Sequence, residues 1–271
     1  MTAKATPRVF ELDLLRLVAA VMVLLYHHTW RGAALPHLRA PEFPGLVNGI
    51  TRYGFLGVEL FFFISGMVIF RSAAHGSARR FFISRIARLY PAYWVMVTIS
   101  YVVVRIAGNP AGLGVSPRAY AFNLTMLQTF HGTDLVDGVY WTLAIELSFY
   151  AIVWLTLLLR QGKNLFPVLS AWLLGSIVVD LLHDHHAVSG AIYSPAQTYL
   201  AVQWAPFFVA GACCALLGTD RRHDWRVWVV LGTSGASAVW RSAQYTNHNV
   251  GVLFPPGSYE LWISAVVVAA L

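Results

Sequence analysis

Long blocks of apolar residues alternate with short polar stretches along the chain. A membrane-crossing helix needs about 20 mostly apolar residues, and the pattern predicts helices over residues 12–30, 53–70, 91–106, 140–159, 165–182, 194–217 and 227–240. A further apolar run opens at residue 261 and continues to Leu271. We therefore expect an all-α, polytopic transmembrane helix bundle of about eight to ten spans. We expect it to form one membrane-embedded domain over residues 1–271, truncated at its C-terminal end.

Two segments depart from this simple pattern. Residues 71–89 place basic side chains on one side of a helical projection and apolar ones on the other, which predicts an amphipathic helix at the membrane surface, followed by a span that Pro91 opens. Residues 120–130 are apolar but too short to cross a bilayer unaided. This second segment could be re-entrant, strongly tilted or packed within the bundle.

The composition excludes a soluble protein. Apolar residues make up 58% of the chain and charged residues 11%, whereas a soluble domain carries about a quarter charged residues. The net charge of +7 is not gathered in a stripe, so it does not indicate nucleic-acid binding. Basic residues in short loops are typical of cytoplasmic segments. We expect a multi-pass protein of the cell (cytoplasmic) membrane, in contact with membrane lipid and with a cytoplasmic N-terminus.

Charged and titratable residues interrupt the first apolar block. Arg16 and His27 are eleven positions apart, which puts them on one helix face and about 16 Å apart along its axis. Asp13 lies within about 60° of Arg16 on the same stripe. Because a charge near the bilayer centre costs at least about 2.5 kcal/mol, such residues usually face a bundle interior or a wet cavity. The stripe predicts a buried site and argues against a cleavable signal peptide.

Four polar motifs follow one another along the chain. In the first, Arg16 and His27 are separated by ten residues of ELDLLRLVAAVMVLLYHH. The second is GFLGVELFFFISGMVI, in which Glu59 precedes an aromatic run and Ser65 and Gly66 follow it. Small residues at such positions favour close helix packing.

The third and fourth motifs complete the series. The third, FFISRIARLYPAYW, carries Arg85 and Arg88, and the fourth is NLTMLQTF followed by WTLAIELSFY, with Trp141 and Glu146. Together the four motifs resemble the acyltransferase-3 family of integral membrane O-acyltransferases. That family more often has aspartate at the position of Glu59, a difference that keeps the charge.

The resemblance implies transfer of an acyl group, commonly acetyl, from acyl-CoA to a hydroxyl of a carbohydrate or glycosylated acceptor. An alcohol is a poor nucleophile near neutral pH, so the reaction needs a base. Histidine, with an ordinary pKa of about 6.5, accepts and returns protons in this range. We therefore expect His27 to be the base, whereas His28 points about 100° away and is interpreted as a packing or headgroup-level residue.

Supporting roles remain open at several positions. Arg16 is expected to pair with Asp13 or Glu59, and it either orients the base network or is structural. Glu146 either orients His27 or locks helices together through Arg16. Ser65, Gly66 and Trp141 are interpreted as supporting residues.

Arg85 and Arg88 lie one helical turn apart, a spacing that can bracket phosphate oxygens. Since coenzyme A is rich in phosphate, we expect them to hold the donor; the alternative is contact with lipid headgroups. His183, Asp184, His185 and His186 form a loop cluster that is interpreted as solvated, so no metal site is predicted.

Two rival functions remain open. Asp13, Arg16, His27, Glu59 and Glu146 could form the proton or substrate pathway of a transporter or lipid-linked sugar flippase. The chain could also be an inactive bundle that supports a partner enzyme. The identity of the acceptor, the acyl chain length and the oligomeric state are not predicted by the sequence.

Overall fold

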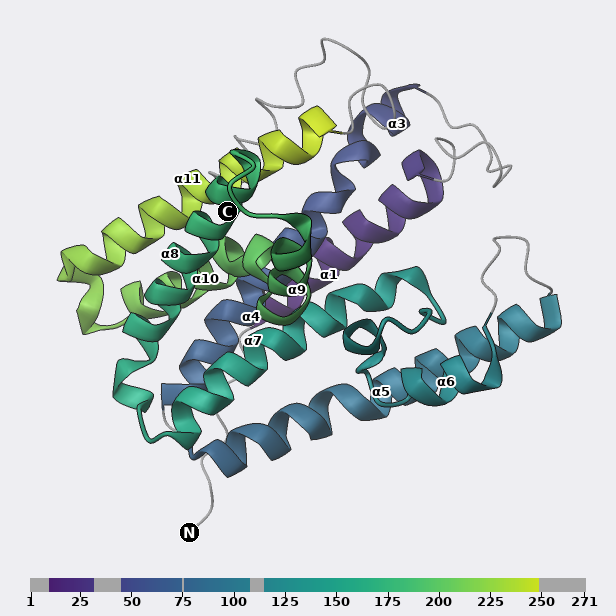
Figure 1. Cartoon of the computed structure of the whole chain (residues 1–271), viewed down its shortest axis with the longest axis horizontal. Helices are drawn as coiled ribbons and strands as arrows, with labels where there is room; N and C mark the ends of the chain where they lie inside the picture. The colour runs from purple at the N-terminus through teal and green to yellow at the C-terminus, as the bar shows by residue number, and fades with distance from the viewer. Residues whose placement is uncertain (1–9, 32–44, 75, 108–114, 249–271) are drawn as a thin grey trace.

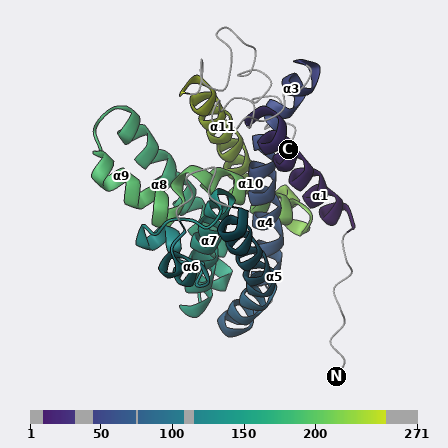
Figure 2. The same cartoon turned by 90° about the vertical axis from the view of Figure 1, so that its right-hand side faces the viewer.

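A computed structural model describes residues 10–31, 45–74, 76–107 and 115–248 of the chain. These residues form helices joined by turns, with no β-strand among them (Figures 1 and 2). The longer helices are α1 (Phe10–Leu25), α4 (Leu56–Ala74), α5 (Ala78–Ala107), α7 (Trp141–Leu158), α8 (Leu165–Asp184), α9 (Gly190–Leu200), α10 (Ala205–Leu217) and α11 (Trp225–His248). The shorter pieces are a π-helical turn η1 (Tyr26–Arg31), α3 (Gly45–Thr51), α6 (Pro117–Asn123), and the 3-10 turns η3 (Arg52–Phe55), η4 (Gln128–His131), η5 (Gly138–Tyr140), η6 (Gly162–Asn164), η7 (Val202–Trp204) and η8 (Asp220–His223).

The helical fold class is as predicted, but the expected number of spans is not confirmed. Four helical stretches in the described part are long and apolar enough to cross a membrane, and five if a bent pair counts as one span. They are Gly49–Ala74, Ala78–Ile106, Gly138–Leu158 and Gly162–Asp184, with the pair Gly190–Leu200 and Val202–Leu217 as the fifth. The apolar run after residue 261 lies outside the described residues.

Residues 71–74 of the expected surface helix end α4, and residues 78–89 begin α5, which continues through Pro91 into the expected span, so the predicted boundary at Pro91 is wrong. Proline is tolerated inside membrane helices when neighbouring groups satisfy the freed carbonyl. Few residues of α5 are buried, and apolar side chains such as Val95, Ile99 and Val103 are exposed along it. This exposure suits a helix at the lipid-facing edge of the bundle.

Residues 120–130 do not form a crossing helix. They contribute the end of the seven-residue helix α6, a turn, and the start of η4, and they pack along α5. The Tyr93 hydroxyl donates to the Asn123 carbonyl at 2.6 Å, and the Trp94 indole donates to the Leu124 carbonyl at 2.9 Å. Of the three placements that the sequence left open, packing against the bundle is the one found.

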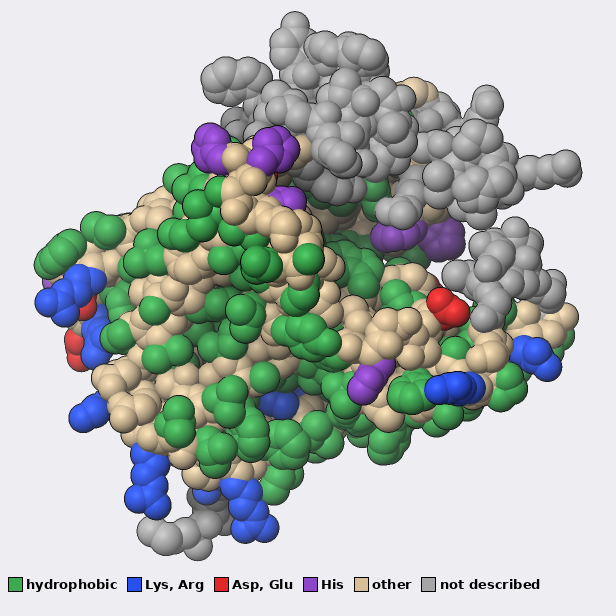
Figure 3. Space-filling model, viewed as in Figure 1, with side chains coloured by type: hydrophobic (Ala, Val, Ile, Leu, Met, Phe, Trp, Pro, Cys, Tyr) green, Lys and Arg blue, Asp and Glu red, His purple; other side chains and the backbone are tan. Residues whose placement is uncertain are grey.

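Because this segment does not cross, the turns that follow α4, α7 and α10 lie at the same end of the bundle, on the left and lower left of Figure 1. Most of the Lys and Arg side chains visible in Figure 3 lie at that end, although some lie at the opposite, right-hand end, and most His side chains lie away from the basic end. The basic residues there include Arg71, Lys163 and Arg221. One basic end is what the positive-inside rule requires of a helical membrane protein.

Residues 194–217, expected to be one helix, are broken at Ala201. Helix α9 ends at Leu200, and the chain bends by 61° before η7 and α10 continue. Ala201 adopts φ 49° and ψ 39°, the left-handed region that residues with a side chain rarely occupy. A single apolar window over this segment gave no sign of the break.

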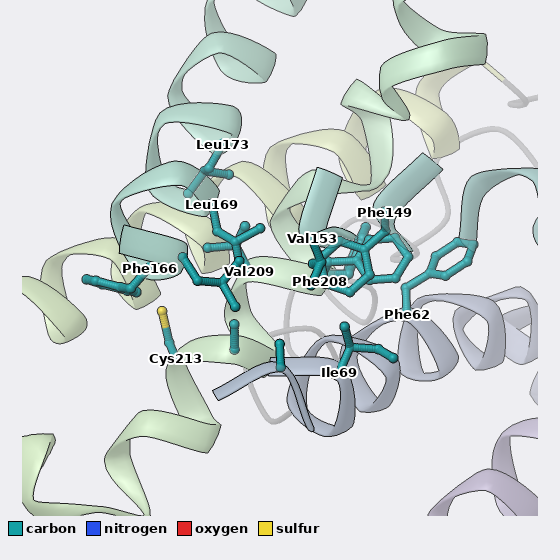
Figure 4. Close-up of a cluster of buried hydrophobic side chains, with 14 of the residues drawn as sticks. Phe62, Ile69, Phe149, Val153, Phe166, Leu169, Leu173, Phe208, Val209 and Cys213 are labelled. Atoms are coloured by element: carbon teal, nitrogen blue, oxygen red, sulfur yellow. The ribbon is translucent and has the colours of Figure 1, made fainter. Parts of the chain in front are cut away.

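Helices α4 and α10 form the centre of the bundle and approach each other closely. A Cβ atom at Gly66 would lie 2.0 Å from the Phe208 carbonyl oxygen, and one at Gly211 would lie 2.0 Å from the Phe63 carbonyl oxygen. The two backbones therefore approach closely at both glycines, a contact that a side chain at either position would prevent. Around this contact Phe149 stacks on Phe208 with ring centroids 4.2 Å apart (Figure 4).

Candidate active site

A cavity of about 750 Å³ opens between α1, α4, α5, α7 and the start of α10, with α11 closing one side. It collects most of the residues singled out in the sequence, although these come from four separate segments. Those on its wall are Arg16, His27, Glu59, Ser65, Arg85, Arg88, Trp141 and Glu146. Asp13 is exposed and lies outside this lining, and Gly66 faces α10 instead.

The cavity is elongated along α4. Its lining on that helix extends from Val58 to Ile69, eleven steps or about 16 Å along the helix. Tyr26 packs edge-on against Phe55, just before α4, so its neighbour His27 lies toward that end. Arg85 lies beside Tyr150, whose hydroxyl shares the Glu146 carboxylate with Ser65, further along α4, and so lies toward the other end. We refer below to the imidazole end, near His27 and Phe55, and to the guanidinium end, near Arg85.

His27 lies in the π-helical turn η1, which continues α1. Such turns are rare and are frequent at functional sites. Its Nδ1 is 2.9 Å from the Val23 carbonyl oxygen, which can only accept a hydrogen bond. Nδ1 must therefore carry the proton, and in a neutral imidazole Nε2 is left as the basic atom. His28 is exposed and is not part of the cavity wall.

Arg16 meets Asp13 through a contact of 3.1 Å between Nη1 and Oδ1. Of the two carboxylates that the sequence offered, this is the one that the structure brings to the guanidinium. The two residues are one helical turn apart and partly exposed, so their ion pair contributes about 0.3–0.5 kcal/mol to the stability of the fold. Arg16 nevertheless lines the cavity.

Glu146 receives two hydrogen bonds on the same oxygen. The Ser65 hydroxyl of α4 donates to Oε1 at 2.6 Å, and the Tyr150 hydroxyl, one turn along α7, donates to it as well. Neither His27 nor Arg16 is among these partners. Tyr150 was not singled out in the sequence, although its spacing of four residues from Glu146 places it on the same helix face.

Glu59 is buried in α4, with 7% of its surface exposed. Its carboxylate interacts with the Ser242 side chain of α11, whereas its Oε2 atom has no partner within hydrogen-bond distance among the described residues. A buried carboxylate oxygen without a partner costs free energy, so this group is a place where a bound molecule can donate.

Arg85 is buried to an unusual degree for its type, with 8% of its surface exposed. Its guanidinium lies 5.6 Å from the centre of the Phe81 ring and 5.9 Å from that of Tyr150, and it donates to the Ser84 hydroxyl at 3.2 Å. Its Nε has no hydrogen-bond partner among the described residues.

Arg88 also lines the cavity but is exposed. Within the part of the chain that the structure describes, neither Arg85 nor Arg88 forms an ion pair with a carboxylate. Two guanidinium groups without a carboxylate partner provide a site for an anion.

Several wall residues were missed by reasoning from the sequence. Tyr26, Gln203, Trp204 and Arg241 line the cavity. The sequence pattern of an apolar helix does not show whether an aromatic side chain faces lipid, the protein core or a cavity. Tyr26 and Trp204 therefore could not be recognised as cavity residues from the sequence. Arg241 did carry one, because a charge at the end of an apolar helix is a candidate for a buried partner.

No group of three or more His, Cys, Asp or Glu side chains in the described ranges is arranged to hold a metal ion. The polar groups of the cavity are instead one imidazole, two carboxylates, hydroxyls and guanidinium groups. Such a set can move a proton and bind an anion.

In the described residues, several membrane-length apolar helices surround a cavity that holds ionisable side chains, which defines the chain as an integral membrane protein. A family profile described as "Acyltransferase domain" matches residues 9–270, which is nearly the whole chain. The chain therefore belongs to the acyltransferase-3 family, as the four motifs predicted.

Curated proteins with similar sequences include Nodulation protein 10 of Rhizobium leguminosarum bv. viciae, which is 30% identical over 160 residues, 51% of this chain and 41% of that protein. Peptidoglycan O-acetyltransferase OatA of Listeria monocytogenes is 25% identical over 75% of this chain and 33% of its own length. Putative peptidoglycan O-acetyltransferase YrhL of Bacillus subtilis is 29% identical over 69% of this chain and 30% of its own length. The match thus spans less than half of each of these relatives. No solved structure shows a significant match to this chain.

Proposed function

We propose that this protein is a membrane-bound O-acyltransferase that moves an acyl group, most simply acetyl, from acyl-CoA to a hydroxyl of a carbohydrate or glycosylated acceptor. The observation that carries the proposal is the state of His27. A histidine on a cavity wall whose Nδ1 donates to a backbone carbonyl has Nε2 available as a base.

The chemistry follows from that atom. As the acceptor hydroxyl attacks the thioester carbonyl, a carbon–oxygen bond forms and Nε2 of His27 takes the hydroxyl proton. Collapse of the tetrahedral intermediate breaks the carbon–sulfur bond, and the imidazolium returns the proton to the departing thiolate. The products are an ester and free coenzyme A, and His27 is restored to its neutral form.

The guanidinium end is proposed to hold the donor. Arg85 and Arg88 lack carboxylate partners in the described residues, so their charge is available to the phosphates of coenzyme A. The thioester is carried at the end of a long, thin pantetheine arm. This shape suits a cavity that extends about 16 Å along α4, with anion-binding groups toward one end and a base toward the other.

The donor site is proposed to face the cytoplasm, where acyl-CoA is made. The end of the bundle that gathers Lys and Arg in Figure 3 is then the cytoplasmic one, in the cell membrane and with the N-terminus on the same side. Exposed apolar residues along α5 are proposed to contact membrane lipid.

A carbohydrate acceptor is proposed from two considerations. The curated relatives OatA and YrhL are named for peptidoglycan, a glycan polymer. The cavity wall also offers aromatic rings and the unpartnered Glu59 oxygen, groups that suit the apolar faces and hydroxyls of a sugar.

Other residues are proposed to support this reaction. Glu146, whose Oε1 accepts from Ser65 and Tyr150, joins α4 to α7 on the cavity wall. Arg16, balanced by Asp13, adds a positive charge to the same wall. Trp141 lines the wall next to these groups. Glu59 is the supporting group with an open hydrogen-bonding position.

The direct test uses the full chain in lipid nanodiscs, acetyl-CoA labelled in the acetyl group, and a panel of peptidoglycan glycan strands, chito-oligosaccharides and lipid-linked glycans. We expect label on one of these glycans with wild type, none with His27→Ala, and wild-type transfer with His28→Ala. His28 is the matched control because it is the next residue, is exposed and is absent from the cavity wall.

Two results would overturn the proposal: movement of a glycan across the membrane without consumption of acetyl-CoA, or full transfer by His27→Ala. The first would favour a transporter. Single-turnover labelling separates direct transfer from a relay through an acyl-histidine, because label then either passes straight to the glycan or stays first on the protein.

A further inference from the structure

The break between α9 and α10 is held in a strained conformation. Ala201 is fully buried and adopts the left-handed backbone region without being a glycine. Such a conformation persists only where the surrounding structure enforces it. Side chains from two neighbouring helices, α8 and α11, enforce it here.

Two carbonyl groups freed by the break are satisfied by side chains. The Trp172 indole of α8 donates to the Leu200 carbonyl at 2.9 Å. The Arg241 guanidinium of α11 donates to the Val202 carbonyl at 3.3 Å. Broken backbone at membrane depth requires such partners, so these contacts make the break a built feature of the bundle.

The same guanidinium belongs to a closed ring of polar contacts. Arg241 forms a buried ion pair with Asp180 of α8. Asp180 accepts from the Tyr193 hydroxyl at 3.0 Å, and Tyr193 accepts from the Gln197 amide at 2.5 Å. Gln197 in turn accepts from the backbone N–H of Gln203 at 3.1 Å, one residue after the carbonyl that Arg241 binds. The ring therefore begins and ends at the break.

The break carries part of the cavity wall. Gln203 and Trp204 follow it directly, and both line the cavity, as does Arg241. The Trp204 ring packs against Phe62 at 5.1 Å and against Trp141 at 5.2 Å. Any change in the bend at Ala201 would shift these two wall residues.

This wall lies away from the guanidinium end. On α7, Trp141 precedes Tyr150 by nine residues, about 13 Å of helix, and Tyr150 is the ring beside Arg85. If the donor phosphates bind at Arg85, as proposed above, the wall faces the part of the cavity where the acceptor must meet the thioester.

Resting on the proposed acyl transfer, we propose that Arg241 and Asp180 are positioning residues for the acceptor. Their buried ion pair fixes the α9–α10 break and thereby holds Gln203 and Trp204 in the conformation that receives the glycan. The pair touches neither the donor phosphates nor His27, so its loss should weaken acceptor binding and leave donor binding intact.

The test compares steady-state kinetics of the full chain in nanodiscs, with acetyl-CoA and peptidoglycan glycan strands as substrates. Single neutralisations leave one buried charge unpaired and are expected to impair folding. The decisive variants are therefore the doubly neutral Asp180→Asn/Arg241→Gln, and Tyr193→Phe, which removes one hydroxyl from the ring. We expect the KM for glycan to rise by about 10- to 100-fold in the double variant and less in Tyr193→Phe, with the KM for acetyl-CoA unchanged.

Gln244→Ala provides the matched control. Gln244 donates to Asp184 at 3.0 Å and so also links α11 to α8, but both residues are exposed and neither lines the cavity. Its glycan KM should equal that of wild type. An unchanged glycan KM in the folded double variant, or an equal rise for both substrates, would overturn the positioning role while wild-type transfer still supports the proposed function. Absence of transfer by wild type would overturn both.

Discussion

The imidazole end and the guanidinium end of the cavity hold their functional groups in opposite ways. His27 is fixed by its own helix, through a hydrogen bond to the Val23 carbonyl that leaves the other ring nitrogen basic. Arg85 is buried against the Phe81 and Tyr150 rings and keeps an Nε without a protein partner in the described residues. The imidazole end thus presents a basic nitrogen, and the guanidinium end presents a positive charge.

The largest effect is expected from a substitution at the imidazole end, which should lower the rate of transfer without changing donor binding. His27→Gln should lower kcat for transfer by about 10²- to 10⁴-fold, because a general base contributes that much. The Kd for coenzyme A, measured by calorimetry in nanodiscs, should stay at the wild-type value because Arg85 and Arg88 are untouched. A parallel loss of coenzyme A binding would mean that the two ends do not act separately.

Arg85→Gln should produce the reverse pattern. Hydrogen bonds to charged groups contribute about 1.5–3 kcal/mol, so coenzyme A should bind about 10- to 150-fold more weakly. Arg85→Lys should restore little, since an ammonium cannot present a planar fork to phosphate. Arg79→Gln is the control, because Arg79 is exposed near the start of the same helix and does not line the cavity. If Arg79→Gln and Arg85→Gln weakened coenzyme A binding equally, the donor would be held by general positive charge and not by a specific site at Arg85.

Smaller effects are expected between the ends, at Glu146. Ser65→Ala removes one of two hydroxyls that donate to the same carboxylate oxygen, a loss of about 1.5–3 kcal/mol in a buried setting and less where the cavity admits water. We expect kcat/KM to fall by about tenfold with modest loss of thermal stability. Ser148→Ala on α7 is the control, because that hydroxyl donates to the Ala144 carbonyl and does not line the cavity. Equal activity in both variants would exclude a role for the Ser65 contact.

The smallest effect is expected at Arg88. It lines the cavity but is exposed, so its attraction to phosphate is screened by water and salt. Arg88→Gln should weaken coenzyme A binding by less than about 1 kcal/mol, and the difference from wild type should shrink as salt concentration rises. A larger loss than in Arg85→Gln would invert the assignment of the two arginines.

Most charged residues of the cavity wall could be predicted from the sequence, with Arg241 as an exception, whereas its aromatic residues could not. Arg16, His27 and Glu146 stood out because an ionisable group in an apolar helix needs a physical reason. Tyr150 and Trp204 did not, since an aromatic ring in such a helix suits lipid, core or cavity equally. The structure supplies what is missing, namely which rings face inward.

The helical class was predictable from apolar length alone, but the continuity of the helices was not. Pro91 suggested a boundary where α5 continues, because neighbouring groups in a membrane compensate for a lost hydrogen bond. The sequence around Ala201 does not predict a break, because the conformation there is imposed by Arg241, Trp172 and other residues distant in sequence. Local patterns do not report such long-range partners.

The backbone contact between α4 and α10 at Gly66 and Gly211 has a mechanical consequence. Two helices that touch through their main chains can neither slide nor separate without losing that fit. Ser65 on α4 and Trp204 directly before α10 are therefore held in fixed positions relative to each other. Any widening of the cavity for the proposed donor would therefore have to involve another helix, and α5 has the smallest buried share among the candidate spans.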